Sequence, residues 1–332
     1  MRYLIFVIGL WCLLLQPLKA YSSSNPIGDY QAQGKLSGKI YATGSDTLAN
    51  MMSFWAEEFS QLYPQVEFEL HAEGSNTAPP ALLSGSANLA PMSRQMNRAE
   101  LALFQQKYGY QPSAIKVAVD AIAVFVHRNN PLQSISIKQL DQIFSAQMQC
   151  GGARKLTHWG ELGLGEKWEH QAIEMLGRDS RSGSYSFFKD IALCRGMFAG
   201  NMQTLPGSAS IVQAISNNPY AIGFSGMGYK TSGVRTLAIM HQGEALLPSI
   251  AADTNWDYPL SRFLYLYVNK APGIALPELL REFVLFVLSN SGQRTVELDG
   301  YASVSPQVIT DDLHKLQINS KGEPAIQLII KE

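Results

Sequence analysis

The sequence predicts an α/β protein of two lobes, in which two parallel-rich sheets with flanking helices are joined by two crossing strands. First, the chain has 332 residues, more than twice the roughly 150 typical of one domain. Second, short apolar runs alternate with segments of helical periodicity, which is the pattern of a parallel sheet. Third, two longer apolar runs, 115–126 and 258–268, are long enough to serve as connections between lobes.

The elements of the first lobe follow in order from the apolar pattern. We expect this lobe to be discontinuous and to consist of residues 38–118 and 264–332. The chain should re-enter the lobe with a helix over 277–288. Its earlier part should contain strand 39–42, a helix with an apolar face from Leu48 to Leu62, strand 66–70, strand 87–90 and helix 98–108.

The second lobe, expected over 119–263, repeats the alternation of strand and helix. Its elements should be helix 137–147, strand 172–176, helix 184–193, helix 208–216 and strand 220–224. In such sheets, ligands bind in the crevice at the carboxyl ends of the strands.

Composition limits the function classes. Hydrophobic residues make up 46% of the chain and charged residues 16%, which is typical of a folded protein with a large core. The formal net charge of −1 and the pI near 6.6 provide no broad basic surface for binding phosphate backbones, so we expect no nucleic-acid partner.

Residues 1–20 have the pattern of a secretory signal peptide. Arg2 precedes an apolar run that ends at Leu15, and Ala20 is a small residue suited to cleavage. The run is too short for the roughly 20 residues of a membrane-spanning helix. Residues 21–37 are rich in Ser, Gly and Gln, and we expect them to form a flexible leader of an exported protein.

Export also bears on the three cysteines. Cys12 lies in the signal peptide, which leaves Cys150 and Cys194 as an even pair. Oxidising conditions favour a disulfide between them, and two buried thiols are the alternative. We expect no metal site, because neither cysteine is in a Cys-x-x-Cys pair and no two histidines are spaced i, i+4.

Three segments place glycine and hydroxyl residues between a strand and a helix: 43–47, 74–77 and 178–184. The free N–H groups and positive dipole end of a helix, with adjacent hydroxyls, favour an anion, although Ser and Thr also cap helices without binding ligands. Arg178 adds a guanidinium that can hold two oxygens. Ser93 and Arg94, after the third strand, are placed to bring a second guanidinium to the cleft.

The order of these motifs resembles the periplasmic phosphate-binding proteins of ABC-type phosphate importers. The resemblance rests on Gly44-Ser45-Asp46-Thr47-Leu48, Gly74-Ser75, Ser93-Arg94 and Arg178-x-x-x-Ser182-Gly183-Ser184, with further landmarks at Trp159-Gly160-Glu161-Leu162, Ala221-Ile222-Gly223-Phe224 and Ser291-Gly292-Gln293. It covers most of the chain from about residue 38 to 305. It implies a type II periplasmic-binding-protein-like fold.

The resemblance also implies a function and a site. The protein would be a periplasmic, monomeric, non-enzymatic receptor without a cofactor that captures inorganic phosphate and passes it to the membrane permease of an ABC importer. Thr47 would contribute a hydroxyl and Leu48 a backbone N–H. The remaining implied ligands are Ser75, Arg178, Ser182, Gly183 and Ser184.

One departure from the family bears on selectivity. The best-known members have an Asp that accepts a hydrogen bond from protonated phosphate, and this chain has Arg94, which cannot accept one. Discrimination against sulfate would then need another acceptor, for which Asp46 and Glu73 are the candidates. A receptor for another oxyanion, such as sulfate or a phosphonate, is therefore an alternative.

A hydrolase or phosphatase that uses the same anion site is the other alternative. The motifs His-Glu-x-x-His, Gly-x-Ser-x-Gly and Gly-x4-Gly-Lys-Ser/Thr are all absent. The six histidines are scattered through the chain. We therefore favour a binding protein, while a nucleophilic serine assembled only in three dimensions would not be visible in the sequence.

Overall fold

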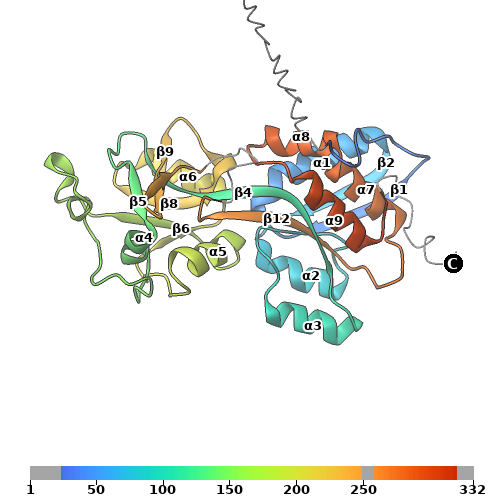
Figure 1. The fold of residues 1–332 in the computed structure, drawn as a ribbon, viewed down its shortest axis with the longest axis horizontal. Helices are drawn as coiled ribbons and strands as arrows, with labels where there is room; N and C mark the ends of the chain where they lie inside the picture. The colour runs from blue at the N-terminus through green and yellow to red at the C-terminus, as the bar shows by residue number, and fades with distance from the viewer. Residues whose placement is uncertain (1–23, 249–256, 320–332) are drawn as a thin grey trace, which may run out of the picture.

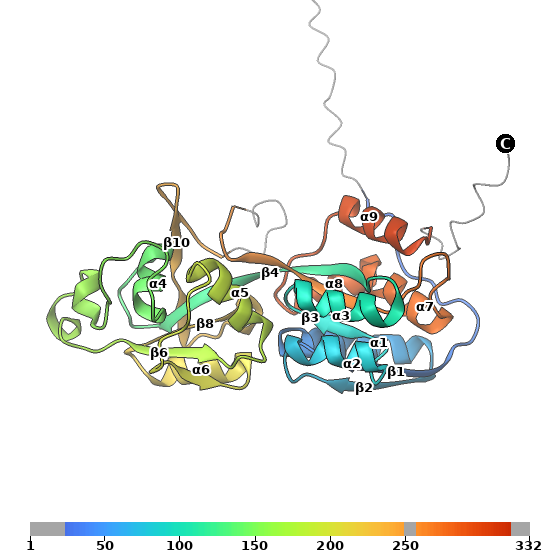
Figure 2. The same cartoon turned by 90° about the horizontal axis from the view of Figure 1, so that it is seen from below.

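The computed structural model describes residues 24–248 and 257–319. Two lobes lie side by side, and strands β4 (Ser113–His127) and β12 (Ser261–Val268) run from one lobe to the other (Figure 1, Figure 2). The predicted signal peptide over 1–20, with Cys12, lies outside the described residues. Within the described residues, no helix is both long and apolar enough to span a bilayer.

The first lobe holds a parallel strand pair and helices on both sides of β12. Its other elements are β1 (Ser37–Thr43), α1 (Ala49–Leu62), β2 (Gln65–His71), α2 (Ala78–Ser84), β3 (Ala90–Met92), α3 (Arg98–Tyr108), α7 (Glu278–Leu288), α8 (Asn290–Leu298) and α9 (Pro306–Leu316). β1 and β2 pair in parallel, from Ser37 opposite Gln65 to Thr43 opposite His71.

The side chains of β12 alternate between two cores. Leu264, Leu266 and Val268 are buried against α1 and α7, whereas Tyr265 and Tyr267 pack with side chains of α2 and α3. Successive side chains of a strand point to opposite faces, so a strand that is covered on both faces is apolar throughout. This arrangement explains why the segment reads as one continuous apolar run.

The second lobe has the same strand and helix alternation and several short strands. Its elements are β5 (Ser134–Ser136), α4 (Ile137–Phe144), β6 (Glu174–Arg178), α5 (Gly183–Ala192), β7 (Gln203–Leu205), α6 (Ser208–Asn217), β8 (Ala221–Gly226), β9 (Val234–Thr236), β10 (Ala238–His241) and β11 (Glu244–Leu246). β6 pairs in parallel with both β7 and β8. The short strands β7, β9, β10 and β11 were not predicted.

The α/β class with two crossing strands is confirmed, but one mixed sheet contains strands of both lobes, while β1-β2 and β11-β10-β5 form separate sheets. The order of the mixed sheet is β3-β12-β4-β8-β6-β7, with β9 also paired to β4. The reason is the length of β4, because its first part pairs antiparallel with β12 and its second part pairs antiparallel with β8. The parallel pairs lie farther from the crossing.

Several predicted boundaries differ from those in the structure. The strand expected over 87–90 is β3, at Ala90–Met92, and the strand expected over 172–176 is β6, at Glu174–Arg178. The helix expected to reach residue 147 ends at Phe144, because Ser145 has an extended backbone and its Oγ accepts the N–H groups of Gln147 and Met148.

Part of the predicted flexible leader packs against the first lobe. The Tyr30 hydroxyl donates to Glu282 at 2.8 Å, and Asn25 Nδ2 donates to the Leu288 carbonyl at 2.8 Å. Leu36 is buried in the first core. The Ser, Gly and Gln content suggested flexibility, but these few anchoring side chains hold residues 25–36 on α7.

The predicted disulfide is present. Cys150 and Cys194 are bonded, and their Cα atoms lie 5.4 Å apart, within the range that disulfides require. The bond connects the loop after α4 to the end of α5. The helix α5 begins at one of the predicted anion-binding segments. The disulfide therefore fixes the opposite end of the helix from the one that would bind the anion.

We expect the double variant Cys150→Ser, Cys194→Ser to lower the free energy of unfolding by about 4 kcal/mol, since the bond closes a loop with a sequence separation of 44 residues. Denaturant unfolding of both proteins measures this loss. Wild type treated with a reductant is the matched control and should show the same loss. Alkylation of two thiols in the folded, exported wild type would contradict the assignment.

Candidate functional site

Six buried hydroxyl side chains gather where the two lobes meet. We call them the hydroxyl cluster: Ser45, Thr47, Ser75, Ser93, Ser182 and Ser184, each at most 2% exposed. The first four follow β1, β2 and β3 of the first lobe, and the last two begin α5 of the second lobe. The ends of strands in both lobes therefore face one site, as expected for this class of sheet.

Hydrogen bonds connect the cluster within and between the lobes. Ser93 Oγ lies 3.0 Å from Ser45 Oγ and 3.1 Å from Ser75 Oγ, and its backbone N–H donates to Ser75 Oγ at 2.9 Å. Thr47 Oγ1 lies 3.5 Å from Ser184 Oγ of the opposite lobe. These hydroxyls bond to one another and to backbone, so each can redirect its proton toward an anion.

The N-terminus of α5 enters the cluster at Gly183. Ser182 caps this ten-residue helix by accepting the Ser184 N–H at 3.1 Å. A Cβ atom on Gly183 would lie 2.5 Å from both Ser75 Oγ and Ser93 Oγ, which is too close for any side chain. Glycine is therefore required for the positive end of the helix to approach the first lobe.

Leu48 was expected to offer a backbone N–H. That group already donates to the Ser45 carbonyl at 3.3 Å, in the short helix η1 (Asp46–Leu48) that follows β1. The structure thus places Leu48 beside the cluster, with its N–H in a long bond within its own turn.

Arg178 lies at the end of β6 and is 1% exposed. Its Nη2 donates to Asp46 Oδ1 at 2.6 Å, across the boundary between the lobes, and its Nη1 donates to Ser208 Oγ at 2.7 Å. Asp46 Oδ2 accepts the N–H and the hydroxyl of Ser208, both at 3.1 Å. The carboxylate of Asp46 thus accepts three hydrogen bonds from the second lobe, and its role as an acceptor for the ligand stays a prediction.

Two residues that the sequence analysis missed complete the site. Arg262 of β12 and Asp120 of β4 stand opposite each other in the strand register, and their side chains form two hydrogen bonds at 2.9 and 2.8 Å. Arg262 Nη2 also donates to Ser184 Oγ at 2.8 Å. The sequence did carry a signal for them, since each is a charged residue within or beside a long apolar run.

Three polar atoms around the cluster have no hydrogen-bond partner although they are buried: Arg178 Nε, Arg262 Nη1 and Asp120 Oδ1. They are three of the six such side-chain atoms in the described residues. An unpaired buried polar atom is costly. Two of these atoms are donors and one is an acceptor, on side chains that contact Ser184, one another or Asp46.

Buried tyrosines support the backbone of the site. The Tyr229 hydroxyl donates to the Asp46 carbonyl at 2.9 Å, and the Tyr301 hydroxyl donates to the Thr47 carbonyl at 2.8 Å. Burial raises the pKa of both hydroxyls above the ordinary value. Both tyrosines therefore stay neutral donors to a higher pH than an exposed tyrosine does.

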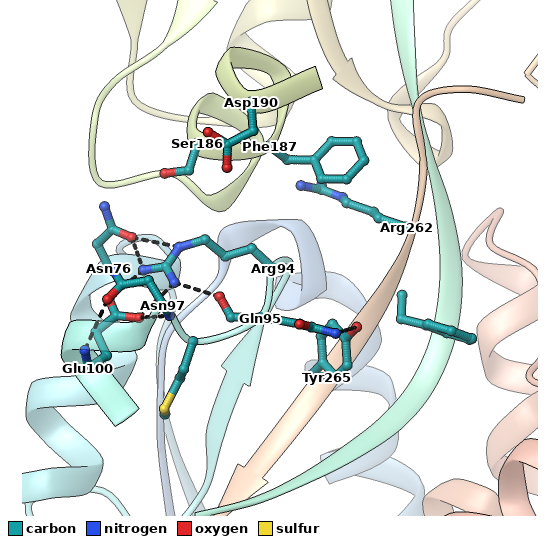
Figure 3. A pocket seen from close by; sticks show the side chains of 12 residues that line it. Asn76, Arg94, Gln95, Asn97, Glu100, Ser186, Phe187, Asp190, Arg262 and Tyr265 are labelled. Atoms are coloured by element: carbon teal, nitrogen blue, oxygen red, sulfur yellow. Dashed lines mark hydrogen bonds and ion pairs between the residues drawn. The ribbon is translucent and has the colours of Figure 1, made fainter. Parts of the chain in front are cut away.

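Arg94 is not brought to the hydroxyl cluster. Its guanidinium donates to Glu100 at 2.7 and 2.8 Å and to Asn76 Oδ1 at 2.9 Å (Figure 3). It lines a cleft of about 580 Å³ beside the cluster, with Phe187 and Arg262 on the opposite side. Glu73, the other candidate acceptor, is exposed. The guanidinium that reaches the hydroxyl cluster from β12 is that of Arg262, which donates to Ser184 Oγ, and the carboxylate paired with it is that of Asp120.

In the described ranges, no group of three or more His, Cys, Asp or Glu side chains could hold a metal ion. The site described above therefore consists of hydroxyls, two guanidinium groups and two carboxylates.

Asp299, at the end of α8, gives the fold a pH dependence. Burial raises the pKa of Asp299 to about 6, although Asn50 and the Met51 N–H donate hydrogen bonds to its carboxylate. Because the folded-state pKa lies above the ordinary value of 3.8, the folded protein binds this proton more tightly than the unfolded chain does. The stability contribution is complete below pH 4 and is lost as the pH rises to about 6.

We therefore expect Asp299→Asn to raise the melting temperature at pH 7 and to leave it nearly unchanged at pH 4, where the wild-type side chain is already protonated. Thermal unfolding at both pH values checks this. An equal change of melting temperature at the two pH values would contradict the assignment to proton binding.

Comparison with known proteins gives a consistent result. Residues 30–291 match the model of the PBP superfamily domain. The chain is 47% identical over 290 residues to the phosphate-binding protein PstS of Pseudomonas aeruginosa, covering 87% of this chain and 90% of that protein. It is 25% identical over 293 residues to the phosphate-binding protein PstS of Bacillus subtilis, covering 86% and 88%.

Solved structures share the fold. A putative phosphate ABC transporter substrate-binding protein from Clostridium perfringens, with bound phosphate, aligns with a TM-score of 0.68 at 24% identity, over 81% of this chain and 100% of that one. An ABC-type phosphate transport receptor from Vibrio cholerae aligns with a TM-score of 0.62 at 22% identity, over 79% and 99%.

Proposed function

The chain belongs to the PBP superfamily and, within it, to the family of PstS phosphate-binding proteins, and on this premise we propose that it captures inorganic phosphate between its lobes and delivers it to the permease of an ABC importer. The protein acts as an exported, periplasmic, monomeric receptor that performs no chemistry on its ligand. Residues 1–20 direct the export.

One observation carries the choice of ligand, which is the set of three unpaired buried atoms beside the hydroxyl cluster. The oxygens of phosphate accept hydrogen bonds from Arg178 Nε and Arg262 Nη1. Because phosphate still carries protons at neutral pH, it also donates a hydrogen bond to Asp120 Oδ1. Sulfate is fully ionised and has no proton to donate. Opposite Asp120 it would place two acceptors together, which costs several kcal/mol in a buried site.

The ligand set that we propose combines the expected residues with the two that the structure adds. Thr47, Leu48, Ser75, Ser93, Ser182, Gly183 and Ser184 provide hydroxyl and backbone donors, Arg178 and Arg262 provide guanidinium donors, and Asp120 provides the acceptor. The charges of Arg178 and Arg262 are offset by Asp46 and Asp120. Binding therefore depends on directed hydrogen bonds and the end of α5 more than on net positive charge.

The division into lobes that move against each other is part of this proposal. We place lobe 1 at 38–118 with 264–332 and lobe 2 at 119–263. The buried cores support this division to within one residue, since β4 residues up to Val119 belong to the core of the first lobe and those from Ala121 belong to the two cores of the second lobe. Only a state that contacts the anion from both lobes is stabilised by it, so phosphate closes the cleft.

A hydrolase using the same site has less support. Ser182 Oγ is occupied as the cap of α5, and no histidine in the described part of the chain is hydrogen-bonded to the hydroxyl cluster. A serine nucleophile needs such a base. Sustained release of phosphate from an aryl phosphate that disappears in Ser182→Ala would favour the enzyme.

Calorimetry of the mature protein, freed of bound anions, tests the proposed function. We expect phosphate and arsenate, which both carry protons at pH 7, to bind at least about 100-fold more tightly than sulfate. Equal affinity for sulfate would favour a general oxyanion receptor, and the absence of phosphate binding would overturn the proposal.

A further inference from the structure

We propose that Arg94 is a positioning residue that slows the release of phosphate by holding Asn76 in contact with the opposite lobe. This inference rests on the proposed function. It assigns Arg94 a role in which the guanidinium never touches the anion.

Asn76 bridges the lobes beside the hydroxyl cluster. It follows Ser75 directly, in the short helix η2 (Ser75–Thr77) of the first lobe. Its backbone N–H donates to the Arg181 carbonyl at 3.0 Å, and its side-chain Nδ2 donates to the Ser180 carbonyl at 2.7 Å. Both carbonyls belong to the loop between β6 and α5. Asn76 therefore joins the two segments that contribute hydroxyls to the anion site.

The close approach of these segments is visible in the backbone as well. A Cβ atom on Gly74 would lie 2.6 Å from the Arg181 carbonyl oxygen, and the φ angle of Gly74 is +120°. Any other residue at position 74 would force the segments apart. The loop of the second lobe thus rests directly on the turn that carries Ser75 and Asn76.

Arg94 determines which way the Asn76 amide faces. Its Nε donates to Asn76 Oδ1 at 2.9 Å, and its Nη2 donates to the same oxygen. With Oδ1 held by the guanidinium, Nδ2 must face the Ser180 carbonyl. Without Arg94 the amide of Asn76 can rotate so that Oδ1 faces the Ser180 carbonyl. Two acceptor oxygens then face each other, and the hydrogen bond is lost.

Arg94 is itself held in place. Glu100 accepts two bonds from the guanidinium and also accepts the Asn97 N–H as the capping box of α3. The Arg94 side chain is only 10% exposed, and Figure 3 shows it lying between Asn76 and Glu100. The hydrogen bonds thus run from the N-terminus of α3 through Glu100 and Arg94 to Asn76, and the bond from Asn76 to Ser180 continues this series into the second lobe.

These contacts exist only while the lobes are together. Phosphate leaves after the lobes separate, so a contact that stabilises the joined state lowers the dissociation rate and leaves the encounter with free phosphate nearly unchanged. The lost contact is the neutral hydrogen bond from Asn76 Nδ2 to the Ser180 carbonyl, and its loss corresponds to a change of up to about tenfold.

The test measures phosphate association and dissociation rates, by stopped-flow, for Arg94→Met, Asn76→Ala and the double variant. We expect each single variant to raise the dissociation rate by up to about tenfold with an association rate within about twofold of wild type. The double variant should match the single variants within about twofold, because Arg94 acts through Asn76. Arg98→Met, an exposed arginine at the start of α3, is the charge-matched control and should behave as wild type.

Other outcomes overturn the inference. If Arg94 were an anion ligand, Arg94→Met would weaken affinity far more than Asn76→Ala, and the two effects would multiply in the double variant. If Arg94 only supported α3, the melting temperature of the phosphate-free variant would fall while the dissociation rate stayed the same. Failure of wild type itself to bind phosphate overturns the proposed function and this inference together, whereas unchanged rates in variants of a binding wild type overturn this inference alone.

Discussion

Replacing Arg178 with alanine should weaken phosphate affinity by about 10³-fold or more. The substitution removes a charged donor, worth about 1.5–3 kcal/mol. It also leaves the Asp46 carboxylate without its guanidinium partner, now 2.6 Å from Asp46 Oδ1, and breaking such a partly buried pair costs about 3–5 kcal/mol. The unpaired negative charge would then stand beside the site where the anion binds.

Calorimetry of Arg178→Ala measures the loss, and circular dichroism establishes that the variant is folded. Arg181→Ala is the matched control, because Arg181 lies on the same loop, is 56% exposed and pairs with Asp179. Adding Asp46→Asn to Arg178→Ala should recover about tenfold of the lost affinity, since it removes the unpaired charge. Affinity of Arg178→Ala within about twofold of wild type would refute the assignment of Arg178 as a ligand.

The second large effect is expected at Asp120. We expect Asp120→Asn to change the ratio of phosphate to sulfate affinity by about 100-fold, with weaker phosphate binding and stronger sulfate binding. The carboxylate oxygen Oδ1 is buried and unpaired, so on the proposed function it accepts a hydrogen bond from phosphate and repels the ionised oxygens of sulfate. An amide at this position offers a donor to either anion and so removes the discrimination.

Four anions make this experiment specific. The affinity for arsenate should change as the affinity for phosphate does, because both anions carry protons at pH 7. The affinity for selenate should change as that for sulfate does, because neither of these anions carries a proton. Asp179→Asn, in the loop beside the site, is the control for the loss of one negative charge. A phosphate-to-sulfate ratio that stays within about twofold of wild type in Asp120→Asn would show that another group reads the proton.

Much of the site could be predicted because it is built from contiguous segments. The turns after β1 and β2 and the start of α5 each combine glycine with hydroxyls, and the geometry of a parallel sheet brings the ends of its strands together. Local sequence and fold class therefore single out the segments that hold Thr47, Ser75, Arg178 and Ser184, whereas the roles expected for these residues came from the family resemblance.

Asp120 and Arg262 could not be found in this way, because their meeting depends on the register between two strands that are 142 residues apart in sequence. Local patterns carry no information on register. Arg94 shows a different difficulty, since its place after β3 follows from the sequence, but its side chain is paired with Glu100. A choice between two partners depends on distances that the sequence does not contain.

The joining of both lobes by β4 and β12 has a mechanical consequence. The two connections are adjacent antiparallel strands, paired from Ser261 opposite Ala121 to Val268 opposite Ser113, with a bulge between Leu264 and Tyr265. A hydrogen-bonded ribbon of this kind resists stretching and shear within its plane but bends and twists out of it, most readily where a bulge interrupts the ladder. If the lobes close on the ligand as proposed, we expect this ribbon to limit their motion to bending and twisting about β4 and β12, so that each closure returns Asp46 to Arg178 and Asn76 to Ser180 in the same alignment.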